Sequence, residues 1–83
     1  MAQWQIEYSR EVKNYFWDNG NLVKNLYAAI RSMTENDGFP FSDYDELERI
    51  EIRFKAHGHA VIYERWHTQR MIWITQIIPG PDV

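Results

Sequence analysis

Three runs rich in strand-forming residues lie in the second half of the chain, and in the first of them apolar and charged residues alternate. Residues 50–55 alternate without a break, and two further β-rich runs follow at residues 59–66 and 70–78. Short turn-forming stretches separate the three runs. Runs of this kind at short spacing are typical of antiparallel pairing. We therefore expect a three-stranded meander over residues 50–78.

The first half of the chain begins with one alternating run and then changes to a helical period. Residues 4–9 alternate and predict a first strand. Ser9 is then placed to cap a helix over residues 10–17. The Asn-Gly pair within residues 18–21 favours positive φ and predicts the end of this helix.

A second amphipathic helix is predicted to begin at Gly20 or Asn21 and to end before Gly38 in a left-handed cap. Its apolar residues recur at the spacing of one buried face. These residues are Leu22, Leu26, Ala29, Ile30 and Met33.

The segment between the second helix and the meander has no clear period. Pro40 forbids a continued helix, so residues 38–47 are expected to form a loop across the sheet edge, with their aromatic rings against the core. The acidic run 43–48 is expected to be solvated surface. Residues 79–83 are expected to be a short tail that does not continue the last strand.

The predicted element order is strand, helix, helix, strand, strand, strand. A chain of 83 residues has room for one hydrophobic core. We therefore expect a single α+β domain over residues 1–83, with a mainly antiparallel sheet packed on two helices.

Two helices can cover only one face of this sheet. Ile50, Ile52 and Phe54 are expected to face the helices. The last two strands carry apolar residues on both faces, so apolar groups remain on the far side. That side is interpreted as a dimer or partner surface, or as a face covered by the tail and loop. Trp66 and Trp73 are interpreted as core or interface residues, in preference to base-stacking platforms.

Composition narrows the class of protein. The chain has no cysteine, which excludes a disulfide framework and fits a reducing compartment. The first residues lack the pattern of a signal peptide, and no apolar run is long enough to span a membrane. We therefore expect a cytoplasmic protein that does not engage a membrane. The formal net charge of −3 counts against nucleic-acid binding. No cofactor-binding motif is present, and no cofactor is expected.

Histidines are the first candidate chemical groups. His57 and His59 lie two residues apart, and His67 follows near the next turn. With Glu51 they would offer metal ligands, but three histidines fall short of the four ligands that structural zinc prefers. We therefore expect no metal site. His57 could also serve as general acid or base in phosphodiester cleavage.

Basic residues are the second candidate group. Arg53 and Lys55 project together from the strand over residues 50–55, and Arg65 and Arg70 lie near the second hairpin. A phosphate would find hydrogen-bond donors there. Because acidic residues alternate with these cations, cross-strand ion pairs are the preferred interpretation. The acidic residues are Glu51 and Glu64.

The chain resembles the RelE/ParE superfamily of small toxins from bacterial type II toxin–antitoxin systems. The resemblance rests on Trp4-Gln-Ile-Glu-Tyr-Ser9, on the helical pair that follows, and on residues 50–64. It is most specific over residues 52–64. The resemblance implies a RelE/ParE-like β-α-α-β-β-β fold in which the sheet curls around the helices and its concave side carries the activity.

Residue by residue, the resemblance is incomplete. Arg53 and Lys55 match basic positions of the family, and residues 61–64 match the strand after the turn. However, Ala60 stands where ribonuclease members keep an arginine that meets the scissile phosphate, and His59 replaces a common tyrosine. The chain also ends without the family's basic residues and C-terminal tyrosine.

The resemblance therefore implies a toxin-like component that acts by binding a macromolecular target, as in the ParE branch, with the ribonuclease residues largely lost. One alternative is a residual messenger-RNA endoribonuclease whose catalytic groups are Arg53, Lys55, His57 and His59. The other is a non-toxic, solitary interaction or dimerisation module. Implied partners are an antitoxin protein and a second copy of the chain. The family resemblance also implies RNA, the ribosome or gyrase as a target, but the negative net charge of the chain does not support these targets.

Overall fold

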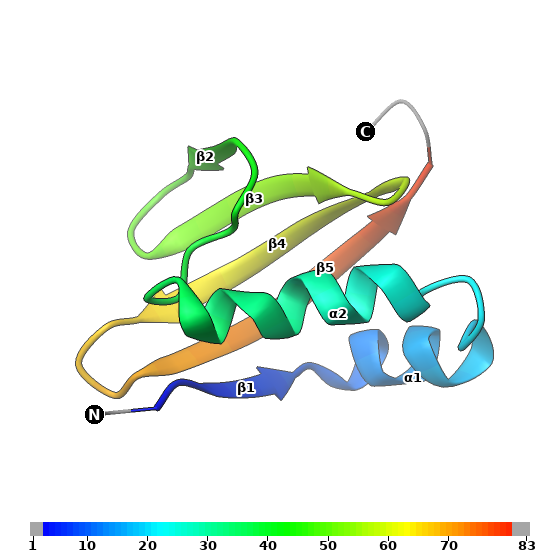
Figure 1. Ribbon diagram of the computed structural model, residues 1–83, viewed down its shortest axis with the longest axis horizontal. Coiled ribbons are helices and arrows are strands. Elements are labelled where there is room, and N and C mark those ends of the chain that lie inside the picture. The colour runs from blue at the N-terminus through cyan, green and yellow to red at the C-terminus, as the bar shows by residue number, and fades with distance from the viewer. Residues whose placement is uncertain (1–2, 81–83) are drawn as a thin grey trace.

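The computed structural model describes residues 3–80 and shows a small α+β fold with one five-stranded mixed sheet and two helices (Figure 1). The strand order in the sheet is β1-β5-β4-β3-β2. β1 runs parallel to β5, and the other neighbours are antiparallel. The strands are β1 (Gln5–Tyr8), β2 (Tyr44–Glu46), β3 (Glu51–Ala56), β4 (His59–Trp66) and β5 (Met71–Pro79).

The first helix, α1 (Arg10–Asp18), starts where the sequence predicts. The Ser9 hydroxyl accepts a hydrogen bond from the Val12 amide at 3.4 Å, which satisfies one of the free N–H groups of the first turn. At the other end, the Asn19 side-chain amide donates to the Tyr15 carbonyl at 2.9 Å. Both ends of α1 are therefore fixed by polar residues next to them in sequence.

The second helix, α2 (Lys24–Ser32), begins later than predicted, although Leu26, Ile30 and Met33 are buried as predicted. The amides of Leu22 and Val23 both bond to the Asn19 carbonyl, so residues 19–23 form a turn. This turn leaves Leu22 69% exposed and buries Val23. The prediction that Leu22 is buried is therefore wrong. The buried face is Val23, Leu26, Ile30 and Met33.

A short 3-10 turn, η1 (Met33–Glu35), extends α2 and leads to Gly38. Gly38 has φ of +82°, as the predicted left-handed cap requires. A Cβ atom added there would lie 3.0 Å from the Trp4 ring and 3.1 Å from Arg65 Nε. The position therefore needs glycine for both its backbone conformation and its close packing.

The segment after Gly38 is only partly as predicted. Its acidic run is exposed, but Tyr44–Glu46 forms the short edge strand β2, which pairs antiparallel with β3. The sequence predicted a loop without a strand, because Pro40 and the acidic residues interrupt any alternation of apolar and polar positions. The unpaired backbone of β3 supplies the partner that forms β2. Phe41 is 68% exposed, so its ring is not against the core.

The core lies between the helices and one face of the sheet. α2 runs across the strands in Figure 1 and contributes its buried face. From the sheet, the fully buried side chains include Tyr63, Ile72 and Ile74. Ile52 and Phe54 face the helices as predicted, whereas Ile50 is 37% exposed and lies outside β3. The Tyr63 hydroxyl donates to the Gly38 carbonyl at 2.6 Å, and burial raises the pKa of Tyr63.

A β-bulge at Thr75 changes which residues of β5 face the core. Ile62 pairs with Gln76 and Tyr63 with Ile74, so Thr75 is the extra residue. The Thr75 hydroxyl donates to the Ile62 carbonyl at 3.1 Å. Because the bulge reverses the alternation, Ile77 packs against the core instead of sharing a face with Trp73, which corrects the regular alternation expected from sequence.

The last strand is longer than predicted. Pro79 is part of β5 and pairs with His59, and the Gly80 amide donates to the Gly58 carbonyl at 2.9 Å. A proline is tolerated at this terminal position because no further ladder bond from its nitrogen is required. The rest of the expected tail, residues 81–83, lies outside the described residues.

No helix in the described part of the chain is long and apolar enough to cross a membrane.

Candidate functional site

Arg53 and Lys55 lie on the face of the sheet that the helices leave open, which we call the helix-free face. Their neighbours Ile52 and Phe54 are buried under the helices, so the two cations point the opposite way. Arg53 lies 4.0 Å from the Asp45 carboxylate of β2. This contact is a weak, largely exposed ion pair. Lys55 is exposed.

His59 lies on the helix-covered side and is only 5% exposed. Its Nδ1 lies 2.8 Å from the His57 carbonyl oxygen, and its Nε2 lies 2.8 Å from the Tyr15 hydroxyl. A carbonyl oxygen only accepts hydrogen bonds, so Nδ1 donates to His57, and Nε2 shares a hydrogen bond with the Tyr15 hydroxyl. Both ring nitrogens are therefore used to join the start of β4 to α1.

His57 occupies the tight turn between β3 and β4. It has φ of 51° and is exposed, and Gly58 follows with φ of 76°. Two consecutive positive φ angles are typical of the two-residue hairpin turn that matches strand twist. The four candidate catalytic residues are thus divided: Arg53 and Lys55 on one face, His59 on the other, and His57 at the end of the sheet.

The three histidines do not form a metal site. His59 lies at the start of β4, with His57 in the turn before it, and His67 lies just past the end of β4, eight residues from His59 along an extended strand. Such a strand spans about 26 Å at about 3.3 Å per residue. Among residues 3–80, no group of three or more His, Asp or Glu side chains is arranged to hold a metal ion.

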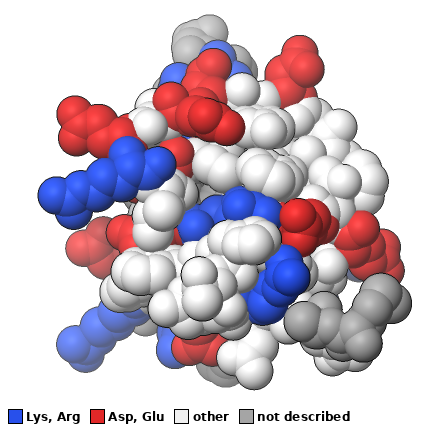
Figure 2. All heavy atoms as spheres, turned by 90° about the vertical axis from the view of Figure 1, so that its left-hand side faces the viewer, with Lys and Arg blue, Asp and Glu red and all other residues white. Residues whose placement is uncertain are grey.

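Arg65 and Arg70 form a cluster away from Arg53 and Lys55. Both bind the Asp37 carboxylate, each at 3.2 Å. Arg65 also lies over two aromatic rings, with its guanidinium carbon 4.0 Å from the Phe39 ring centroid and 4.9 Å from that of Trp4. Figure 2 shows this end of the molecule, with basic atoms set among uncharged surface and acidic groups on either side.

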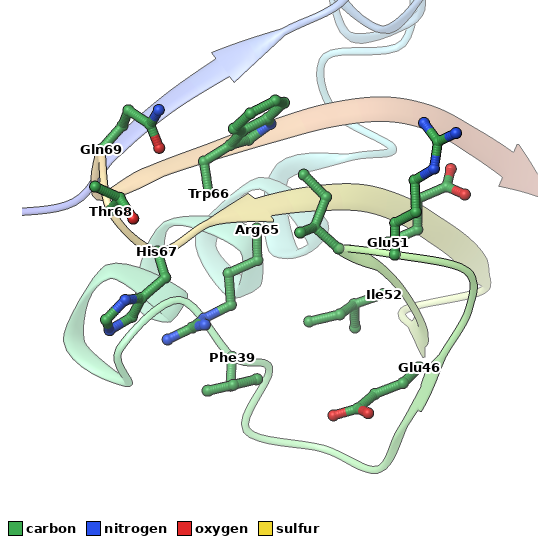
Figure 3. A pocket seen from close by; sticks show the side chains of 11 residues that line it. Phe39, Glu46, Glu51, Ile52, Arg65, Trp66, His67, Thr68 and Gln69 are labelled. Atoms are coloured by element: carbon green, nitrogen blue, oxygen red, sulfur yellow. The ribbon is translucent and has the colours of Figure 1, made fainter.

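This arrangement corrects the expectation that Arg65 and Arg70 pair with Glu51 and Glu64 across strands. Arg65 leaves β4 on the side opposite to Trp66, as Figure 3 shows. It therefore reaches Asp37, in the turn after η1, instead of the carboxylates on the helix-free face. A guanidinium stacked between two rings and bonded to a carboxylate holds the loop after α2 onto the sheet.

One open hollow, of about 380 Å³, lies beside the edge strand β2 and is lined by Arg53 and Lys55 among others. Two further open hollows adjoin the sheet near its edges. One of these, of about 360 Å³, lies beside β3 and the β4–β5 turn and is lined by Glu51, Trp66 and Gln69 among others (Figure 3). The other, of about 380 Å³, lies beside β1 and is lined by Glu7, Met71 and Trp73 among others. Each of these two further hollows combines carboxylate and indole groups at its wall.

The strand register reveals a row of side chains that the sequence interpretation did not assemble. Glu7 pairs with Trp73, Trp73 with Glu64, and Glu64 with Glu51. The alternation within each strand could have placed these residues on an outer face. Only the parallel pairing of β1 with β5 and the register of the β4–β5 and β3–β4 hairpins put all four in one line.

A scan against models of known protein families finds no match to this chain, and a search of curated proteins finds no relative.

Proposed function

We propose that this chain is the toxin-like component of a type II toxin–antitoxin pair and acts by binding a macromolecular target, as ParE-like proteins do, without cleaving RNA. The order of its helices and of its long strands agrees with the order that the resemblance implies. The added strand β2 is a short edge element and leaves that order intact. The finer RelE/ParE topology is part of this proposal.

The observation that carries the proposal is the division of the candidate catalytic residues between two faces. General acid–base cleavage needs an acid, a base and charge-stabilising groups around one phosphate. Here the His59 ring is buried and bonded through both nitrogens, while Arg53 and Lys55 point away from it. Ala60, where the resemblance implies an arginine in ribonucleases, is fully buried. These features favour binding over catalysis.

Expression of the chain alone in bacteria tests the proposal. We expect growth to stop while messenger RNA stays intact, because the residues needed for cleavage do not meet. Trp73→Ala on the helix-free face is expected to restore growth. Trp17→Ala is the matched control, since Trp17 is 90% exposed at the end of α1 and away from that face. Plasmid topology measured in the same cells reports on gyrase.

Two outcomes contradict the proposal. Growth arrest with cut messenger RNA that disappears in Arg53→Ala or Lys55→Ala identifies a ribonuclease instead. Normal growth at verified expression, with unchanged RNA and plasmid topology, identifies a non-toxic interaction module. Circular dichroism of each purified variant shows whether a loss of effect comes from unfolding.

A further inference from the structure

The row Glu7–Trp73–Glu64–Glu51 crosses four of the five strands on the helix-free face. Residues directly opposite on neighbouring strands point to the same side of a sheet. The next row along the strands contains Ile74, which is fully buried under the helices. The row therefore points away from the helices and spans three strand spacings, about 14 Å.

The three carboxylates of the row have no cationic partner in the described part of the chain. No Lys, Arg or His nitrogen of residues 3–80 lies within 4.0 Å of Glu7, Glu51 or Glu64. Glu51 and Glu64 directly oppose one another, an arrangement that destabilises a sheet. Glu64 accepts one hydrogen bond, from Trp66 Nε1 at 3.0 Å, which fixes the position of its carboxylate.

Trp73 lies between two of these carboxylates and is 40% exposed. An indole face is the best aromatic surface for a cation. A guanidinium or ammonium group over Trp73 would meet the ring and the carboxylates of Glu7 and Glu64 together. An exposed tryptophan flanked by unpaired carboxylates is thus complementary to a basic side chain.

The row connects the hollow beside β1 with the hollow beside β3 and the β4–β5 turn. The hollow beside β1 is lined by Glu7, Trp73 and also Arg10, which makes no ion pair with Glu7 within 4.0 Å. The hollow beside β3 and the β4–β5 turn is lined by Glu51 and Trp66 and also by Arg49 and Arg65, of which Arg65 is bound to Asp37. An extended segment that lies along the row could place side chains in both hollows. The row and the two hollows therefore form one continuous binding surface.

We infer that the helix-free face docks a basic, extended segment of a partner protein, with an arginine or lysine of that segment over Trp73 between Glu7 and Glu64. This inference deepens the proposed function and rests on it in one respect, namely that a protein partner occupies this face. The partner chemistry comes from the charges and the aromatic groups of the row.

Other occupants fit the charges less well. The phosphates of a nucleic acid would be repelled by three unpaired carboxylates. A second copy of the chain would bring Arg10, Arg49 and Lys55, but it would also bring its own Glu7, Glu51 and Glu64, and its net charge is −3. A partner segment that carries several basic residues neutralises the whole row.

Fluorescence anisotropy with a labelled octapeptide of alternating arginine and valine tests the inference on the intact chain. We expect saturable binding that weakens as salt is added. Trp73→Ala should weaken it about tenfold, in line with a desolvated cation–π contact. Trp17→Ala should leave it unchanged, since that exposed tryptophan lies at the end of α1.

Variants of the carboxylates test the same inference independently of Trp73. Glu64→Gln keeps the size of the side chain and is expected to weaken peptide binding about threefold at low salt, as one charge pair is lost. Glu11→Gln, on the exposed surface of α1, is the matched control and should have no effect. Circular dichroism confirms that each variant is folded.

Several results would overturn the inference. One is equal binding of a glutamate–valine octapeptide, and another is unchanged affinity in Trp73→Ala. A third is tight binding of a single-stranded RNA oligonucleotide in place of the basic peptide. A fourth is a dimer in sedimentation that Trp73→Ala dissociates, which would assign the face to a second copy. Normal bacterial growth with intact peptide binding contradicts the toxin proposal and leaves this inference standing.

Discussion

The two faces of the sheet differ in how their polar groups are partnered. On the helix-covered face, the Tyr63 hydroxyl bonds to the Gly38 carbonyl and both nitrogens of His59 have partners. On the helix-free face, Glu51 and Glu64 oppose one another without a cation. A buried polar group without a partner costs free energy, whereas water tolerates an unpaired carboxylate. The covered face therefore specifies the fold, and the open face is available for a partner.

The largest expected difference between the faces is in how much stability is lost when an isoleucine side chain is truncated to alanine. Ile74 is fully buried under the helices, and Ile62 is partly exposed on the other side. Ile74→Ala should lower the free energy of unfolding by about 2–5 kcal/mol, because it leaves a cavity. Ile62→Ala should cost about 1 kcal/mol, since less apolar area returns to water. Chemical denaturation measures both; equal losses would show that the helix-free face is covered in solution.

A smaller difference in stability is expected between variants of two tyrosines on the helix-covered side, Tyr63 and Tyr8. Tyr63→Phe removes the hydrogen bond to Gly38 and leaves a buried carbonyl without that partner, so it should cost about 1–2 kcal/mol. The Tyr8 hydroxyl is buried without a hydrogen-bond partner. The Tyr27 ring stacks on the Tyr8 ring, with 6.2 Å between the ring centroids. Tyr8→Phe should therefore leave stability unchanged or raise it. A loss in Tyr8→Phe as large as that in Tyr63→Phe contradicts this account.

The same two tyrosines predict a dependence on alkaline pH. Burial raises the pKa of both Tyr8 and Tyr63 above the ordinary tyrosine value. The folded state then holds these protons after the unfolded chain has released them. The associated stability is fully present below about pH 10 and falls above it, by up to about 1.4 kcal/mol per pH unit for each group. Denaturation curves between neutral and alkaline pH measure the slope, which Tyr63→Phe should reduce.

The smallest expected effect concerns the opposed carboxylates. Glu51→Gln removes the repulsion with Glu64, so it should raise the free energy of unfolding by a few tenths of a kcal/mol at low salt. High salt should erase the gain through screening. Glu35→Gln, in the exposed turn after α2, is the control and should change little. A destabilised Glu51→Gln would show that this carboxylate has a structural partner.

Much of the fold could be predicted from local patterns. The β-rich run over residues 59–66 predicted β4, and Ser9 with the Asn-Gly pair predicted the ends of α1. Local patterns failed where a tertiary partner decides the outcome. The turn over residues 19–23 moved the start of α2, and pairing with β3 created β2. Neither event has a strong signature in the residues themselves.

The candidate site was less predictable than the fold. Proximity in sequence suggested that His57 and His59 act with Arg53 and Lys55, yet neighbouring positions of a hairpin alternate between opposite faces. His59 faces α1, where its Nε2 forms a hydrogen bond with the Tyr15 hydroxyl, 44 positions away in the sequence. Likewise, Arg65 reaches Asp37 on the covered side and not the glutamates that alternate with it.

By itself, the sequence determined the class of the fold, the helix cap at Ser9, the glycine at position 38 and which stretches become long strands. These features depend on backbone preference and on side-chain period, which are local properties. Only the tertiary structure decided which side chains share a face. The parallel pairing of β1 with β5 and the register of the β4–β5 hairpin align Glu7, Trp73 and Glu64, because strand register is set by pairing across the whole sheet.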